Sequence, residues 1–226
     1  MFRLLKLSPP HGWRAVLWEL GIVTLGVLIA LGAEQVVETA HWRRQVESFR
    51  QVVNQELAQN LGTYEYRIKQ NGCVKRRLDE LETWLESWQE GQPRKLAKPI
   101  GAPQSLSLDR SVWASRDAIL VSHMPLRERM TIGGLYDDFE NNEVHRLDER
   151  ETWLRLGEFD GVVDLIGGDF MRLRGLISRA RFRDHRITFN ALLYFREAKA
   201  LGIVPEEVDG TYPYERSFCA SLYGPG

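Results

Sequence analysis

The sequence lacks the short motifs that mark the common enzyme sites. It contains no His-Glu-x-x-His, no Gly-x-Ser-x-Gly, no phosphate-binding Walker loop, no dinucleotide-binding glycine pattern and no Cys-x-x-Cys. Neither charge is in excess, because 30 Lys and Arg residues are balanced by 31 Asp and Glu residues, so no bulk attraction to nucleic acid is indicated. We therefore predict that the protein is not an enzyme, carries no cofactor and has no nucleic-acid partner.

Histidine is scarce, with five residues in the chain. His145 and Asp148 are three residues apart and could share one face of a helix, with His123 or His185 supplied from elsewhere. A metal site needs three or four converging ligands, and the sequence places only two together. We predict no metal site.

Cysteine is scarcer still, since Cys73 and Cys219 are the only two. In an oxidising compartment they could form a disulfide that fastens the C-terminal tail to the helix around Cys73. The alternative is two separate thiols, either buried or free. The compartment therefore bears on the pairing, and we predict the disulfide if this part of the chain lies outside the cytoplasm.

One long stretch without charge is present, at Leu20–Ala33. Extended back through Ala15–Glu19 it has nineteen residues and spans about 28 Å, close to a hydrocarbon core of roughly 30 Å. Ten Leu, Ile and Val residues contribute roughly −3 to −6 kcal/mol to insertion. Glu19, one turn inside the segment, costs less than the roughly 2.5–3.5 kcal/mol of a carboxylate at the bilayer centre. We predict a transmembrane helix over residues 15–33.

The flanking charges predict an orientation. Arg3, Lys6 and Arg14 precede the span, whereas Arg43 and Arg44 follow it at a greater distance. The positive-inside bias therefore favours a cytoplasmic segment over residues 1–14 and an extracytoplasmic domain over residues 34–226. The alternative is a cleaved secretory signal, for which the small residues around 30–32 would suit the peptidase.

One side of the predicted span carries small residues. Glu19, Gly26, Ala30 and Ala33 fall at spacings of seven, four and three, which places them on one helix face. A small-x-x-x-small pair lets two helices approach closely in lipid, so this face predicts a contact with a second copy or another membrane protein. Alternatively, the small residues have no partner and Glu19 reaches the hydrated headgroups.

The same residues resemble the N-terminal signature of an uncharacterised family of bacterial single-pass membrane proteins. The matching residues are Glu19, Gly26, Ala30, Leu31 and Glu38. Val36 and Val37 stand where the family has Trp-Asn, and the resemblance covers roughly residues 15–60. It implies an anchor in the bacterial inner membrane and no established activity.

Beyond the span the apolar residues recur every three or four positions, which predicts helices throughout. The first stripe comprises Val46, Phe49, Val53, Leu57, Leu61 (or Asn60), Tyr64 and Ile68, and the second Val74, Leu78, Leu81, Leu85 and Trp88. Gly72 between them interrupts or kinks the helix. The first stripe suits either bundle packing or a stalk continuous with the membrane helix.

Prolines and glycines in residues 91–107 predict a surface connection. Further helices are predicted from residue 109 or 111 to 120, from Pro125 to about 156 with a break near Asn141, over 162–181, and over 187–200. The tail, residues 203–226, is rich in turn residues and is expected to be irregular and to lie along the surface. The predicted fold class is all-α: an N-terminal transmembrane helix followed by a helical bundle.

Two side-chain clusters allow more than one interpretation. Six arginines lie within fifteen residues: Arg172, Arg174, Arg179, Arg181, Arg183 and Arg186. They predict either a phosphate-binding patch or, as we favour, pairing within the chain, for which the acidic residues over 79–90 are candidates. Trp84, Trp88, Trp113 and Trp153 could line a ligand groove, although aromatic residues at helical spacing more often form core.

These features favour a membrane-anchored helical interaction or scaffold protein without catalysis. Its expected partners are the lipid bilayer and either further copies of itself or another membrane protein. The alternative is an extracytoplasmic ligand-binding, sensor-like bundle that signals through a partner, because the residues before the span are too few to form a cytoplasmic effector domain.

Overall fold

The computed structural model describes residues 12–105, 107–208 and 217–224, and within them the fold is all-α, with no strand. The helices are α1 (Trp13–Lys69), α2 (Asn71–Gln89), α3 (Ser111–Ala114), α4 (Ala118–Ser122), α5 (Leu126–Gly157) and α6 (Gly167–Ala200). Most of the predicted segment 1–14, together with residues 106, 209–216 and 225–226, lies outside this description.

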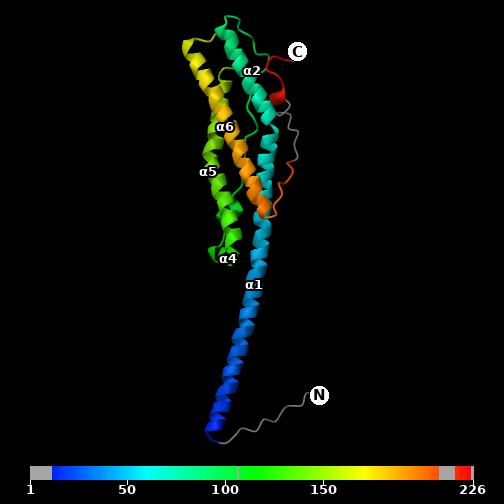
Figure 1. The fold of residues 1–226 in the computed structure, drawn as a ribbon, viewed down its shortest axis with the longest axis vertical. Coiled ribbons are helices and arrows are strands. Elements are labelled where there is room, and N and C mark those ends of the chain that lie inside the picture. Colours follow the sequence, from blue (N-terminus) through cyan, green and yellow to red (C-terminus); the bar gives the residue numbers. More distant parts are fainter. Residues whose placement is uncertain (1–11, 106, 209–216, 225–226) are drawn as a thin grey trace.

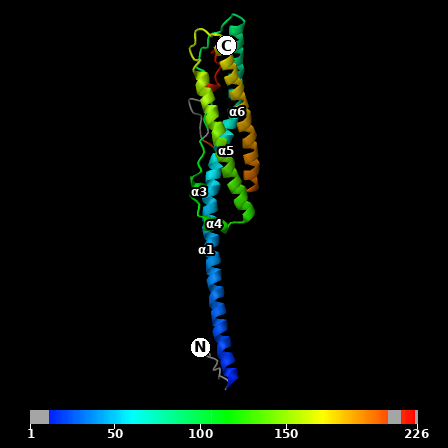
Figure 2. The same cartoon turned by 90° about the vertical axis from the view of Figure 1, so that its left-hand side faces the viewer.

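The bundle has three rods (Figures 1 and 2). The second half of α1 continues into α2 along one line, α5 rises beside it, and α6 returns in the opposite direction, packed against α5, α2 and α1. The short helices α3 and α4 lie near the end of the bundle from which the first half of α1 projects. The C-terminus lies at the opposite end.

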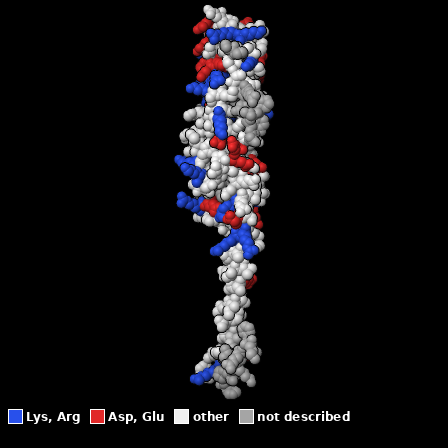
Figure 3. All heavy atoms as spheres, turned by 90° about the vertical axis from the view of Figure 1, so that its right-hand side faces the viewer, with Lys and Arg blue, Asp and Glu red and all other residues white. Residues whose placement is uncertain are grey.

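The first half of α1 stands free of the bundle. From Trp13 to Thr39 every residue except Ala15 is exposed, and the first buried residue is Val46. This free stretch of 27 residues is about 40 Å long at 1.5 Å per residue, and its apolar window has a mean hydropathy of 2.1 with nothing buried. We call this free part of α1 the stem. The stem has a stretch without charged side chains, whereas the surface of the bundle carries both positive and negative side chains (Figure 3). By length and composition, α1 is a candidate membrane span.

Several predicted helix boundaries were wrong. The interruption or kink predicted at Gly72 lies earlier, because α1 ends at Lys69 and Gly72 belongs to α2. Gln70, between the two helices, is buried, and its side-chain oxygen accepts a hydrogen bond from the backbone N–H of Gln104 at 3.0 Å. The single helix expected up to residue 120 is two short ones, because Asp117 caps α4 by accepting from the N–H of Ile119.

The two long helices after Pro125 are less interrupted than the sequence suggested. The break predicted near Asn141 is absent, since Asn142 donates to the carbonyl of Asp138 inside α5 and accepts from Asn190 on α6. The patterns over 162–181 and 187–200 belong to one helix, α6, which begins at Gly167. That helix stops as expected before Gly202, which adopts a positive φ of 74°.

The core consists of two apolar clusters, one in each half of the bundle. The cluster nearer the stem is built around Leu57, Tyr64 and Phe139. The cluster nearer the tip is built around Trp84 and Trp153. Most of the predicted apolar stripe of α1 faces the first cluster, and the stripe of α2 faces the second.

We predicted that the C-terminal tail lies along the surface, but part of it is buried. Residues 217–219 form one helical turn, and Phe218 and Leu222 are buried in the cluster nearer the tip. The backbone N–H groups of Ala97 and Lys98 both donate to the carbonyl of Leu222, at 2.8 and 3.2 Å. Apolar side chains thus anchor a segment whose turn-rich sequence suggested irregular surface structure.

Candidate functional site

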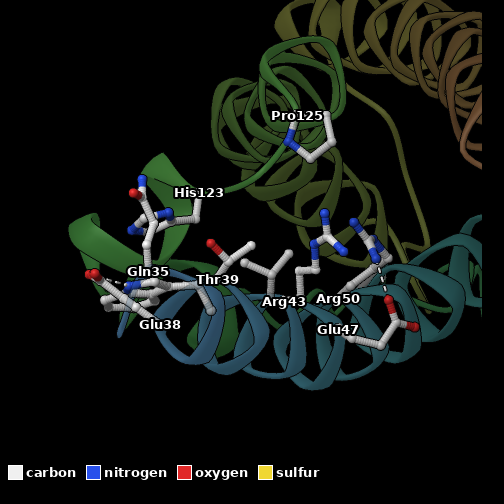
Figure 4. Close-up of a pocket in the computed structure, with 10 residues that line it drawn as sticks. Gln35, Glu38, Thr39, Arg43, Glu47, Arg50, His123 and Pro125 are labelled. Atoms are coloured by element: carbon white, nitrogen blue, oxygen red, sulfur yellow. Dashed lines mark hydrogen bonds and ion pairs between the residues drawn. The ribbon is translucent and has the colours of Figure 1, made fainter. Parts of the chain in front are cut away.

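A groove of about 610 Å³ opens where α1 leaves the bundle. One wall is α1 from Gln35 to Arg50, and the other holds His123 and Pro125, between α4 and α5 (Figure 4). The groove begins directly after the predicted span, so it is the part of the bundle nearest to a membrane that α1 would cross.

The walls of this membrane-proximal groove are held together at two points. The ring of Trp42 stacks on His123 with 4.2 Å between centroids and an interplanar angle of 14°. Further along α1, Arg50 bridges Glu47 on its own helix and Glu128 on α5, with 3.0 Å from Nη2 to Oε2 of Glu128. Hydrogen bonding to Glu128 raises the pKa of Arg50.

The space between these two points is polar and carries both charges, since Glu38 and Glu47 line it together with Arg43 and Arg50. Figure 4 shows Arg43 and Arg50 directed into it from α1. Arg50 is neutralised by its two carboxylates, whereas Arg43 makes no ion pair with any residue that the structure describes. Glu38 also makes no ion pair with a described residue, so the groove offers one guanidinium and one carboxylate beside an aromatic stack, which suits a polar partner segment that carries both charges.

A second polar assembly is buried between the two apolar clusters. Arg67 of α1 is 1% exposed and binds Glu149 of α5 and Asp184 of α6, the latter at 3.0 Å. Asn71 of α2 accepts from Arg67 and donates to Thr188. Burial by itself would lower the pKa of Arg67, but the two carboxylates outweigh this effect and raise it. This layer ties all three rods together at the joint between α1 and α2.

A third buried group holds α3 against α1. Glu56, 4% exposed, accepts from the hydroxyl of Tyr136, from Ser111 Oγ and from the N–H of Val112. Burial raises the pKa of Tyr136, with the hydrogen bond to Glu56 adding to the effect. Both carboxylate oxygens of Glu56 accept hydrogen bonds, so this group fastens α3 and α5 to α1.

The predicted small-residue face lies on the free part of α1. Glu19, Gly26, Ala30 and Ala33 are all exposed, and no atom lies within 4 Å of where a Cβ on Gly26 would be. At 3.6 residues per turn these residues point roughly 180° away from the side of α1 that Val46 buries in the bundle. The bundle therefore leaves this face unobstructed.

The two cysteines meet at the tip-proximal half of the bundle. Cys73 and Cys219 form a disulfide with Cα atoms 4.8 Å apart, across 146 residues of sequence. Beside it, Arg77 is 1% exposed and donates to the carbonyls of Ser217, Phe218 and Ala220. The disulfide and this arginine together fasten the tail to α2.

Four of the six clustered arginines pair within the chain, as favoured from sequence. Arg181 binds Asp79 and Glu82 on α2, which are two of the predicted acids. The other partners were not foreseen: Arg179 and Arg183 both bind Asp148, and Arg172 binds Glu158. Hydrogen bonding to Arg179 lowers the pKa of Asp148.

His145 and Asp148 do lie near each other, but Arg183 contacts both. Among the described residues there is no group of three His, Cys, Asp or Glu side chains that could hold a metal ion. Burial lowers the pKa of His145, and the neighbouring Arg183 lowers it further. The structure therefore places His145 and Asp148, the two residues considered as metal ligands, in a cluster with Arg183.

The four tryptophans considered as a groove do not share one. Trp113 belongs to the cluster nearer the stem, whereas Trp84, Trp88 and Trp153 belong to or pack on the other. Trp84 and Trp88 line a common cleft, at the tip. The burial of Arg67 and Arg77 was not predicted from the sequence. Each lies within or beside an apolar stripe, and a charged residue in that position could have indicated it.

Comparisons of the chain with protein-family models, with curated proteins and with solved structures gave no match.

Proposed function

We propose that this protein is a single-pass protein of the bacterial inner membrane, with its N-terminus in the cytoplasm and its helical domain outside. It acts by binding other proteins and not by catalysis. The observation that carries the proposal is the free part of α1. Its length of about 40 Å matches a bilayer of roughly 40–45 Å including headgroups. The base of the bundle then sits at the outer face of the inner membrane.

The disulfide supports the outside placement. A bond between Cys73 and Cys219 needs an oxidising compartment to form and persist. The basic residues before the span support the same orientation. The disulfide stabilises the end of the domain far from the membrane, and α1 anchors the other end. Such a domain is suited to hold a binding surface at a fixed height above the membrane.

Two separate surfaces serve partners in this proposal. The small-residue face of the span points away from the bundle, so a second copy of α1 can pack against it without a clash between the two domains. The membrane-proximal groove lies on the opposite side of α1, with Arg43 inside it. A self-associated pair would therefore leave both grooves open to a membrane-protein partner.

Self-association can be tested by cysteine crosslinking in membranes. Ser48 is exposed on the same side of α1 as the small residues, so Ser48→Cys is expected to crosslink two copies. Gly26→Leu should reduce the crosslink several-fold, because a branched side chain separates the helices. Gly21→Leu is the matched control, since Gly21 lies on the opposite side of the same helix. Equal crosslinking in both variants would contradict the proposed face.

Topology is tested independently. A compartment-sensitive reporter fused to the C-terminus should be active only if that end lies outside the cytoplasm. The mass of the intact chain, measured on the same preparation, should include residues 1–33. A mature N-terminus near residue 33 would replace the anchor by a cleaved signal and would overturn the proposal.

A further inference from the structure

A cleft of about 310 Å³ lies at the end of the bundle farthest from the stem. It is bounded by the loop that follows α2 and by the connection from α5 to α6. Its apolar surface includes Trp84, Trp88, Phe159 and Val162, and its lining includes the basic residues Arg94 and Lys95. No acidic side chain is among the lining residues. We call it the tip cleft.

The loop wall of the tip cleft is fixed in place. The indole N–H of Trp84 donates to the carbonyl of Arg94 at 2.8 Å, and the N–H of Arg94 donates to Ser87 Oγ at 3.1 Å. Three residues later, Ala97 is bound to the carbonyl of Leu222 in the tail. The guanidinium of Arg94 lies 5.7 Å from the ring centre of Tyr223. The cleft is therefore preformed, and binding would not have to order this loop.

The chemistry of the walls selects for one class of ligand. Trp88 is half-buried and meets Trp84 edge-on at 6.4 Å, and Val162 and Val163 line the same cleft with exposed apolar surface, so an apolar ring or chain can leave water there. Two cations without a lining acid favour a negative charge. The indole N–H of Trp88 is buried and has no acceptor among the described residues, so it represents an unmet donor.

We propose that the tip cleft binds a small molecule with an apolar body and a single carboxylate. The body lies on Trp88, Val162 and Val163, and the carboxylate is held by Arg94 and Lys95 at the rim. The cleft volume is at the lower end of the range for small-molecule sites. This site is independent of the membrane-proximal groove, and it is what a sensor-like bundle would require.

The test uses the full chain in lipid nanodiscs and three probes of one shape: 3-phenylpropionate, 3-phenylpropanol and 3-phenylpropylammonium. Isothermal titration, corrected with empty nanodiscs, should give binding of the carboxylate about tenfold tighter than of the alcohol, since a charge-assisted hydrogen bond contributes at least that factor. The ammonium probe should not bind.

Variants assign the binding to the cleft. Arg94→Gln and Lys95→Gln should each weaken the carboxylate about tenfold or more, and both residues are exposed, so folding is retained. Lys98→Gln removes the same charge from the same loop outside the cleft and should change nothing. Trp88→Phe should weaken the carboxylate more than the alcohol.

Three outcomes would overturn the proposal: equal affinity for alcohol and carboxylate, equal loss in Lys98→Gln, or no binding of the carboxylate up to about 10 mM. None of them touches the self-association experiment, whose readout is a crosslink between spans.

Discussion

Replacing Arg67 tests whether the buried ion-pair layer holds the rods together. Arg67→Met removes the cation that faces two carboxylates, and Glu149, whose pKa burial already raises, is left at 4% exposure without its partner. Breaking a buried pair by removing one partner costs about 3–5 kcal/mol. That is a large share of a typical unfolding free energy of roughly 5–15 kcal/mol.

The second variant decides whether the cost comes from the orphaned charge. In the double variant Arg67→Met, Glu149→Leu, the remaining carboxylate is Asp184, whose side chain is 19% exposed and can reach water. Replacing a buried pair by apolar side chains is often neutral. The double variant should therefore recover at least about 2 kcal/mol of the loss.

The assay is urea unfolding of the full chain in detergent micelles, followed by far-ultraviolet circular dichroism. Arg155→Met is the control, because Arg155 and Glu151 form an exposed pair on α5, and its loss should cost less than about 0.5 kcal/mol. The reasoning fails if Arg67→Met costs less than about 1 kcal/mol. It also fails if the double variant is as unstable as the single one.

Three further predictions concern other parts of the fold. Cys219→Ser opens a 146-residue loop and should lower the unfolding free energy by up to about 5 kcal/mol in the chain-entropy model; no difference from the oxidised wild type in urea would refute this. Gly62→Ala would place a methyl group 1.9 Å from the carbonyl oxygen of Glu206 and should cost about 1–3 kcal/mol, whereas Gly175→Ala, in open space on α6, should stabilise by about 0.5–1 kcal/mol. Because burial and Arg183 depress the pKa of His145 in the folded state, the unfolded chain binds more protons below about pH 6.5 and stability should fall as pH drops from about 7 to 5; a melting temperature that falls equally in His145→Gln would count against this residue.

The long helices could be read from sequence because their apolar residues repeat every three or four positions. The interruptions were harder to predict. The polar run around Asn142 suggested a break, yet Asn142 pairs with Asn190 on the neighbouring helix, a partner 48 residues away. Conversely, Asp117 looked like one more helical residue and is in fact a cap. In both cases a local pattern was overridden by a specific hydrogen bond.

The polar layer could not be predicted for a related reason. Arginine and glutamate in a helix are normally solvated, and nothing near Arg67 in the sequence shows that Glu149 and Asp184, 82 and 117 residues away, face it. Part of the tip cleft could be predicted from sequence, because Trp84 and Trp88 were among the candidates to line a groove. Its cationic wall at 93–96 and its far side at 159–163 come together only through the fold.

The unbroken α1 connects these parts. Between Gly32 and Gly62 the sequence has neither glycine nor proline, so nothing in the chain uncouples the membrane segment from the bundle. In the proposed self-association, the rotational position of the span would fix which side of the domain faces a partner, with the small residues toward the partner helix and the groove away from it. A hinge after the span would have made the two surfaces independent. Because α1 has no such hinge, a contact between spans would also set the relative positions of the two helical domains, which is what the proposed interaction function requires.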